Sequence, residues 1–178
     1  MQNANLVSPR GWAACVLAAA LAVTGCGSGT PASADEGTKG IEAHFTVAVD
    51  GHPASIQVAI LPSEQERGLM QRPDLGKDEG MIFINAAPQR LSFWMRNTPE
   101  PLDVAYIDAD GVVVELYPLL PLDERPVNSH SSRLKFALEM PSGWFAANGV
   151  RSGARIDMAA VAAAVKARGF EPEKFGIR

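Results

Sequence analysis

The chain is poor in cysteine, and this scarcity excludes several kinds of site. Cys15 and Cys26 are its two cysteines, and both precede the part of the sequence that has strand patterns. We expect Cys15 to be removed with an N-terminal segment and the sulfur of Cys26 to be modified, so the folded domain has no free thiol. Disulfide bridges, thiol catalysis and cysteine-ligated metal centres are therefore not expected, and a packed core must supply the stability.

Positive charge is also in the minority. The chain has 16 Lys and Arg against 20 Asp and Glu. Removal of residues 1–25 would take away Arg10 and no acid, which leaves 15 basic against 20 acidic side chains and a net charge of -5. No basic stripe, the electrostatic signature of nucleic-acid binding, is visible, so we expect no nucleic-acid partner.

Motifs that would indicate a particular reaction are absent as well. The sequence contains no G-x-x-x-x-G-K phosphate loop, no H-E-x-x-H metal motif and no G-x-S-x-G nucleophile turn. His44, His52 and His130 are scattered, without the close spacing of metal ligands. The sequence therefore indicates no particular reaction, metal or cofactor.

What is present begins with an export signal. Arg10 precedes an uncharged apolar stretch, residues 12–23, that is too short to span a bilayer and ends in small residues. Thr24 and Gly25 then precede Cys26, an order that resembles the bacterial lipobox, in which the cysteine sulfur receives diacylglycerol and the chain is cut just before it. We therefore expect residues 1–25 to be a lipoprotein signal peptide.

This interpretation places the protein outside the cytoplasm, anchored to the bacterial membrane through lipid at Cys26. In a cell with an outer membrane, the domain would face the periplasm. Residues 26–40 are rich in Gly, Ser, Thr and Ala and cannot bury enough apolar surface to offset their ordering entropy, so we expect a flexible tether. The remaining residues, 41–178, have a length that suits one domain.

Alternating apolar residues predict that this domain is mainly β. Residues 45–49 and 56–60 alternate on either side of Asp50-Gly51, and residues 104–107 and 112–116 flank a turn that ends at Gly111. Further strands are expected at residues 81–84, 91–95, 136–140 and 155–157. Short strands with Gly and Pro between them predict a small barrel-like fold or a compact sandwich, in the α+β class, with short peripheral helices.

Helices are expected at three places. Ser63 and Glu66 form a capping-box pattern that predicts a short helix ending near Met70. A second short helix is expected within residues 142–148. The third should run over residues 158–168, where Asp157 can cap an alanine-rich stretch and a narrow apolar stripe can pack on the outside of the sheet.

Several motifs resemble those of one family, the domain of unknown function 192. They occur in the right order between about Val47 and Ile156. They are Glu66-Arg67-Gly68-Leu69-Met70-Gln71-Arg72, Gly80-Met81-Ile82-Phe83, Phe93-Trp94-Met95-Arg96-Asn97-Thr98, Pro101-Leu102-Asp103 and Leu138-Glu139-Met140-Pro141-Ser142-Gly143. The resemblance implies a small, mostly β fold that is often exported or tethered, and it brings no established activity.

The charged and amide residues near the Phe93–Asp103 segment are the candidate site. We expect Arg67, Asn97 and Asp103 to meet beside Trp94 at one end of the barrel, in a pocket for a small polar or anionic ligand. Trp94 is expected to be structural, because large rings are usually buried. The alternative for Asn97 is a turn residue that hydrogen-bonds its own backbone.

Glu139 completes this set of candidates. It alternates with Leu138 and Met140, so it is either a solvent residue or the anionic half of a buried pair. We expect a structural ion pair with Arg67 or Arg96 ahead of catalysis. The favoured interpretation is a binding or interaction module near the membrane, whose partner is a small ligand or an envelope protein. An extracytoplasmic enzyme is the alternative. A copper site is the weaker third choice, because Met70, Met81, Met95, Met140 and Met158 form no ligand cluster in the sequence and fit core packing better.

Overall fold

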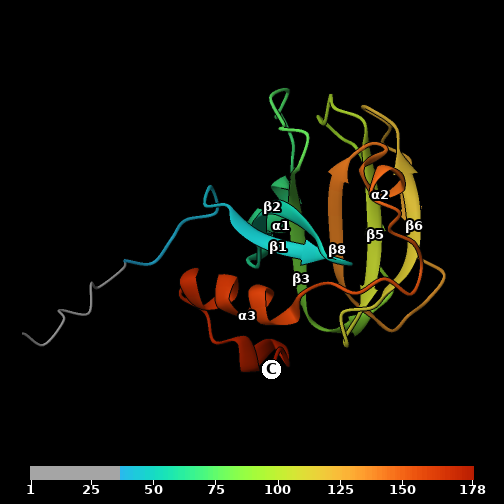
Figure 1. Ribbon diagram of the computed structural model, residues 1–178. Coiled ribbons are helices and arrows are strands. Elements are labelled where there is room, and N and C mark those ends of the chain that lie inside the picture. The colour runs from blue at the N-terminus through green and yellow to red at the C-terminus, as the bar shows by residue number, and fades with distance from the viewer. Residues whose placement is uncertain (1–36) are drawn as a thin grey trace, which may run out of the picture. The chain divides into compact units, whose positions relative to one another are not determined.

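A six-stranded mixed sheet forms the centre of the computed structural model, which describes residues 37–178 (Figure 1). Residues 36–178 are one compact unit, and the expected signal peptide, Cys26 and most of the expected tether lie outside the described residues. The elements in chain order are β1 (Phe45–Val49), β2 (His52–Ala59), α1 (Pro62–Arg67), β3 (Glu79–Gln89), β4 (Ser92–Phe93), β5 (Leu102–Asp108), β6 (Val113–Leu119), β7 (Val127–Asn128), β8 (Leu134–Pro141), α2 (Trp144–Ala147), α3 (Met158–Ala167) and the 3₁₀ helix η1 (Pro172–Phe175).

Both expected hairpins are confirmed, because their turns match their sequences. Asp50 and Gly51, which join β1 and β2, have φ of 51° and 85°, the left-handed values that a tight two-residue hairpin turn requires. Gly111, which precedes β6, has φ of 78°. In both hairpins the pairing is antiparallel. Phe45, Val47 and Val49 of β1 share one face of the sheet, whereas the apolar residues of β5 alternate between its two faces.

The sheet has the order β1-β2-β3-β8-β5-β6 and is not closed into a barrel. β2 and β3 are parallel, with α1 in the crossover between them, and all other neighbours are antiparallel. Two isolated bridges, Val49 to Ile156 and Val112 to Arg155, and the backbone hydrogen bonds around them link the segment after α2 to the β1 and β6 regions. The strand expected at residues 155–157 is thus reduced to these bridges, because Asp157 already caps α3. The mainly β class is confirmed, but a closed barrel is wrong.

Each face of the sheet has its own core, because side chains alternate along every strand. We call one the helix-covered face; it packs against residues of α2, α3 and η1. The other, the loop-covered face, packs against Leu69, Leu91, Phe93 and Met95 from loops and from the short β4 strand, which pairs with β7. The domain is therefore a sandwich in which loops replace the second sheet on one side.

The helices agree with the sequence in place but not in every cap. Asp157 accepts a hydrogen bond from the amide of Ala160 at 3.0 Å, so the cap of α3 is confirmed. α1 begins two residues early, because Pro62 occupies its first turn and the Glu64 carboxylate accepts the amides of Ile60 and Leu61. The Ser63-Glu66 capping box is therefore wrong. Among residues 37–178, no helix is both long and apolar enough to cross a membrane.

Candidate functional site

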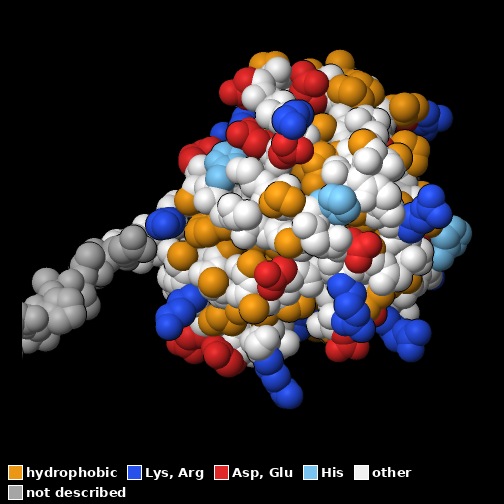
Figure 2. Space-filling view, in the orientation of Figure 1, with side chains coloured by type: hydrophobic (Ala, Val, Ile, Leu, Met, Phe, Trp, Pro, Cys, Tyr) orange, Lys and Arg blue, Asp and Glu red, His pale blue; other side chains and the backbone are white. Residues whose placement is uncertain are grey.

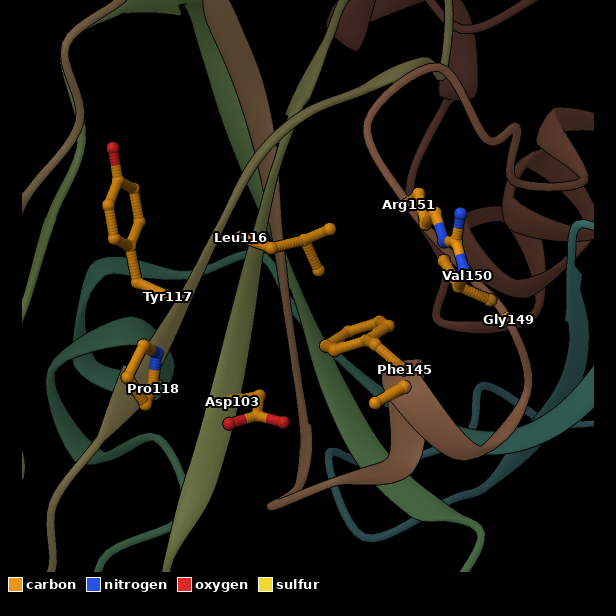
Figure 3. A pocket seen from close by; sticks show the side chains of 9 residues that line it. Asp103, Leu116, Tyr117, Pro118, Phe145, Gly149, Val150 and Arg151 are labelled. Carbon is orange, nitrogen blue, oxygen red and sulfur yellow. The ribbon is translucent and has the colours of Figure 1, made fainter.

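A cleft of about 340 Å³ opens beside β6, at the edge of the helix-covered face (Figure 3). We call it the edge cleft. Its lining comes from β5, β6, α2 and the segment after α2, and consists of Asp103, Leu116, Tyr117, Pro118, Phe145, Ala146, Gly149, Val150 and Arg151. A cavity of this volume, with mostly apolar walls and a few polar groups, has the composition of small-molecule sites.

The apolar walls of the edge cleft come from two distant parts of the chain. Leu116 on β6 and Phe145 on α2 point toward one another, whereas the Tyr117 ring points away (Figure 3). Tyr117 turns away because successive strand residues alternate, and its hydroxyl donates to Glu115 at 2.7 Å on the other side of the sheet. Phe145 is 3% exposed, so this wall is part of the core and is fixed in place.

Asp103 provides a fixed carboxylate beside these walls. It is half-buried on β5, where it pairs with Met140 of β8. Its Oδ2 atom accepts the backbone N–H of Gly143 at 2.7 Å, and its Oδ1 atom accepts the Ser142 hydroxyl at 3.5 Å. These bonds tie the start of α2 to β5 and hold the carboxylate, which retains acceptor lone pairs for a ligand.

Arg151 supplies the opposite charge in the lining, and its side chain is exposed. A guanidinium offers several N–H donors, whereas the Asp103 carboxylate only accepts. The edge cleft can therefore hold a ligand that has an apolar body, a donor group for Asp103 and an acceptor for Arg151. A purely anionic ligand would face the Asp103 charge.

The structure does not bring the expected site residues together. Arg67 lines a different cavity, of about 220 Å³, together with Gln57, Arg72 and Met81. Its Nη1 atom lies 3.4 Å from Oε1 of Glu42. Met81, which lines this cavity with Arg67, belongs to the loop-covered face. Asp103 points to the same side of β5 as Ala105, which belongs to the helix-covered face. Arg67 and Asp103 therefore lie on opposite sides of the sheet.

Trp94 and Asn97 lie at a third place. Trp94 is 43% exposed, so the expectation that it is buried is wrong. β4 ends at Phe93, and it is Phe93 that turns inward, 4.8 Å from Phe83 between ring centres. Asn97 is exposed in a loop with φ of 54°, a conformation that Asn tolerates, and its carbonyl accepts the amide of Gln71 at 2.8 Å.

Glu139 is buried on the loop-covered face and makes no ion pair. It is 4% exposed and lies between Met81 and Val104 in the register of the sheet. Within residues 37–178 no hydrogen bond or salt bridge reaches its carboxyl, so the expected pair with Arg67 or Arg96 is wrong. Burial raises the pKa of Glu139 to about 8, because the charged form would lose its hydration. At neutral pH it is a carboxylic acid without charge.

The positions of Glu139 and of two methionines bear on the enzyme and copper-site alternatives. An enzyme requires convergent polar groups, and in the described residues no hydrogen bond or salt bridge joins the Glu139 carboxyl to another polar side chain. Met81 and Met140 lie on opposite faces of the sheet, so these two thioethers do not share a site.

Sequence reasoning missed Leu116, Phe145 and Arg151. The short helix expected within residues 142–148 contained a clue, because Phe145 lies on it next to a glycine and serine turn. No local pattern, however, shows that this helix packs beside the start of β5 and the middle of β6. These three residues meet only through tertiary packing.

Two solved structures resemble this chain. A protein from Sinorhizobium meliloti 1021, proposed to be a transcription regulator, is 29% identical with a TM-score of 0.63, and the match covers 67% of this chain and 96% of that one. A protein of unknown function from Novosphingobium aromaticivorans DSM 12444 is 34% identical with a TM-score of 0.60, covering 64% of this chain and 84% of that one. No curated protein matches the chain.

A family comparison agrees with the motifs between β1 and α3. The family DUF192, described as an uncharacterized ACR, matches residues 45–158, well over half of the chain. That range contains every strand of residues 37–178 and the edge cleft, but neither Cys26 nor most of α3. The chain belongs to the DUF192 family.

Proposed function

We propose that this protein is an exported, lipid-anchored binding module that takes a small polar ligand in the edge cleft. The export half rests on the apolar stretch of residues 12–23 and on the lipobox-like residues before Cys26. The proposal of ligand binding rests on one observation, the Asp103 carboxylate held in the same cleft beside the apolar side chains of Leu116 and Phe145. Small-molecule sites combine such walls with few, fixed polar groups.

The ligand's chemistry follows from these groups. The Asp103 carboxylate can accept a hydrogen bond from an N–H or O–H group of the ligand. An ammonium group would bind most tightly, because its hydrogen bond to a carboxylate is charge-assisted. The apolar side chains of the cleft can pack against a short hydrocarbon chain of the ligand. We therefore favour a small amine, amide or zwitterion over a simple anion. We do not propose the role of transcription regulator, suggested for the Sinorhizobium protein, for this chain. The net charge of -5 over residues 26–178 disfavours binding to nucleic acid.

Three matched probes test the binding half: butylamine, valeramide and butyrate. Their binding is followed by backbone amide NMR shifts of Phe145, Val150 and Arg151. We expect the amine and the amide to shift these signals and butyrate to shift them least. Asp103→Asn should abolish the advantage of the amine over the amide.

A bulky residue in the cleft provides the decisive variant. Ala146 lines the cleft and is exposed, so Ala146→Trp should fill the space without removing core contacts. Ala147 is also exposed on α2 but does not line the cleft, so Ala147→Trp is the matched control. If none of the three probes shifts the cleft signals, or if both variants respond like the parent domain, the edge cleft is not the binding site.

The export half has its own test. Cys26→Ser should prevent lipid attachment and maturation, because the sulfur is the expected acceptor, and it should leave the domain folded. Incorporation of labelled palmitate by the Cys26→Ser protein would contradict the anchor. This measurement is independent of ligand binding.

A further inference from the structure

Exposed apolar side chains gather at the end of the sheet where β5 begins and β6 ends. Leu102, the first residue of β5, pairs with Leu119, the last residue of β6, so the loops next to them lie at the same end. Trp94 is 43% exposed, Leu120 60% and Leu122 61%. Figure 1 places both loops at the top, where Figure 2 shows hydrophobic side chains at the surface. We call Trp94, Leu120 and Leu122 the apolar tip.

Backbone hydrogen bonds hold the two loops of the apolar tip together. The amide of Met95 donates to the carbonyl of Asp123 at 2.8 Å, and the amide of Leu122 donates to the carbonyl of Thr98 at 3.0 Å. Trp94 and Leu120 line one shallow cavity between these loops. The three side chains therefore stand on two loops whose backbones are fixed to one another.

Leu122 has an unusual conformation for an exposed leucine. Its φ is 58°, in the left-handed region, which costs a branched residue about 1 kcal/mol or more. Its side chain is mostly in solvent and adds nothing to either core cluster. Folding alone gives no reason for a large apolar side chain at this position, whereas Gly or Asn would adopt the turn with less strain.

The charges around the apolar tip balance closely. Asp123 binds Arg125 through paired contacts of 2.7 to 3.1 Å, and the Arg96 guanidinium lies 5.5 Å from the centre of the Trp94 ring. Glu100 and Glu124 are the remaining acids of these loops. The loops therefore provide little electrostatic attraction to a strongly charged partner, and the apolar side chains supply the driving force for contact.

We infer that the apolar tip docks into the surface of the lipid bilayer to which the protein is tethered. Trp and Arg are suited to the interface, where the ring and its N–H meet lipid headgroups and a guanidinium meets phosphate, while the two leucines enter the acyl region. The inference rests on the proposed anchor at Cys26. It adds a second contact, made by the domain itself, that orients the edge cleft relative to the membrane.

The length of the expected tether permits this contact. Cys26 and Gly37, the first described residue, are eleven peptide units apart and span at most about 40 Å when extended. A domain of this size has a diameter of about 35 to 40 Å. A domain anchored at Cys26 can therefore bring the apolar tip to the bilayer, and short tethering raises its local concentration there.

Vesicle binding by the unlipidated domain tests the inference. Residues 37–178 contain all strand partners and both cores, so this domain can be used without the N-terminal segment. Of its two tryptophans, Trp144 is buried, and Trp144→Phe leaves Trp94 as the only fluorophore of this kind. With millimolar phosphatidylcholine vesicles, we expect Trp94 emission to shift to the blue and to be quenched by brominated acyl chains.

Variants identify the side chains that insert. Leu120→Ser and Leu122→Ser should each weaken vesicle affinity by about tenfold, because each removes an inserting apolar side chain. Leu61 is also exposed, at 44%, but lies beside α1, so Leu61→Ser is the matched control and should bind as the parent does. Because the charges balance, anionic lipid should change the affinity less than either leucine substitution does.

Two outcomes would overturn the inference. One is a folded domain that neither sediments with vesicles nor shows quenching of Trp94. The other is equal binding by the Leu61, Leu120 and Leu122 variants, which would place the contact elsewhere. Should the tip variants instead abolish crosslinking to a single envelope protein in cells, the surface is a protein interface. Palmitate labelling at Cys26 reports separately on the anchor, so failure of the tip and failure of the anchor are distinguishable.

Discussion

Two carboxyl groups on opposite faces of the sheet differ in almost every physical respect, although they lie on neighbouring rungs of the same strand pair. Asp103 pairs with Met140, and Glu139 pairs with Val104. Asp103 is half-buried and accepts the amide of Gly143, whereas Glu139 is 4% exposed with a pKa raised to about 8 by burial. The alternation of the sheet, and not the type of acid, decides which group is charged and available to a ligand.

The covering layers explain this difference. Helices cover one face, but they leave the β6 edge open, and the edge cleft lies there. Loops and β4 cover the other face and enclose Glu139 among apolar side chains. A buried, neutral acid costs less than a buried carboxylate, so the enclosed face favours the protonated form of Glu139.

The largest expected effect comes from the core of the helix-covered face. Phe136 on β8 is fully buried, and Phe136→Ala should lower the free energy of unfolding by about 3 to 5 kcal/mol, because a cavity adds to the lost apolar burial. Chemical denaturation of the domain checks this value. A loss below about 1 kcal/mol would mean that this face collapses around the gap and is not the rigid wall of the edge cleft.

Next comes the pH dependence due to Glu139. Its pKa is raised from 4.5 in the unfolded chain to about 8 in the folded domain, so between these values the unfolded state releases a proton that the folded state keeps. Stability from this group is complete below pH 4.5, falls as the pH rises from 4.5 to about 8, and is fully lost above that pH. The loss at pH 7 is about 3 kcal/mol.

Glu139→Gln isolates this effect, because glutamine has a similar shape and does not ionise. Denaturation curves at several pH values should show a smaller decline from pH 5 to pH 8 for the variant than for the parent. The acids with lowered pKa, such as Glu64 and Asp123, lose their contributions only at more acidic pH. Parallel profiles for the two proteins would show that Glu139 is solvated or paired in solution.

A smaller effect is expected from the fixed carboxylate of the edge cleft. Asp103→Ala removes the acceptor for the Gly143 amide and should cost about 1 kcal/mol of stability, since this hydrogen bond is partly solvated. The same substitution should increase amide hydrogen exchange at Gly143, which exchange measured by NMR would detect. Unchanged exchange there would separate Asp103 from the positioning of α2.

The smallest effect is expected at Trp94. Because Trp94 is 43% exposed and adds to neither core cluster, Trp94→Ala should change stability by less than about 1 kcal/mol. Phe93→Ala is the comparison, since Phe93 packs against Phe83 and Tyr106 and should cost several times more. A melting temperature that falls equally for both variants would make Trp94 a core residue after all.

The features that the sequence predicted well are local ones. The turns at Asp50-Gly51 and Gly111 and the cap at Asp157 depend on residues within a few positions of one another, and all three have the expected form. The period-two pattern likewise predicted the main strands and the mainly β class. By contrast, Trp94 and Glu139 were placed wrongly, because the length of β4 and the partners of a buried acid depend on distant segments.

The sequence by itself determined the strands, the hairpins, the family motifs and the expectation of an N-terminal lipid anchor, since each depends on neighbouring residues. Tertiary structure alone decided that the sheet stays open, that Arg67 and Asp103 lie on opposite faces, and that Asp103, Leu116 and Phe145 line one cleft. The physical reason is that alternation along a strand fixes which residues share a face, while strand order and the covering layers decide what each face meets.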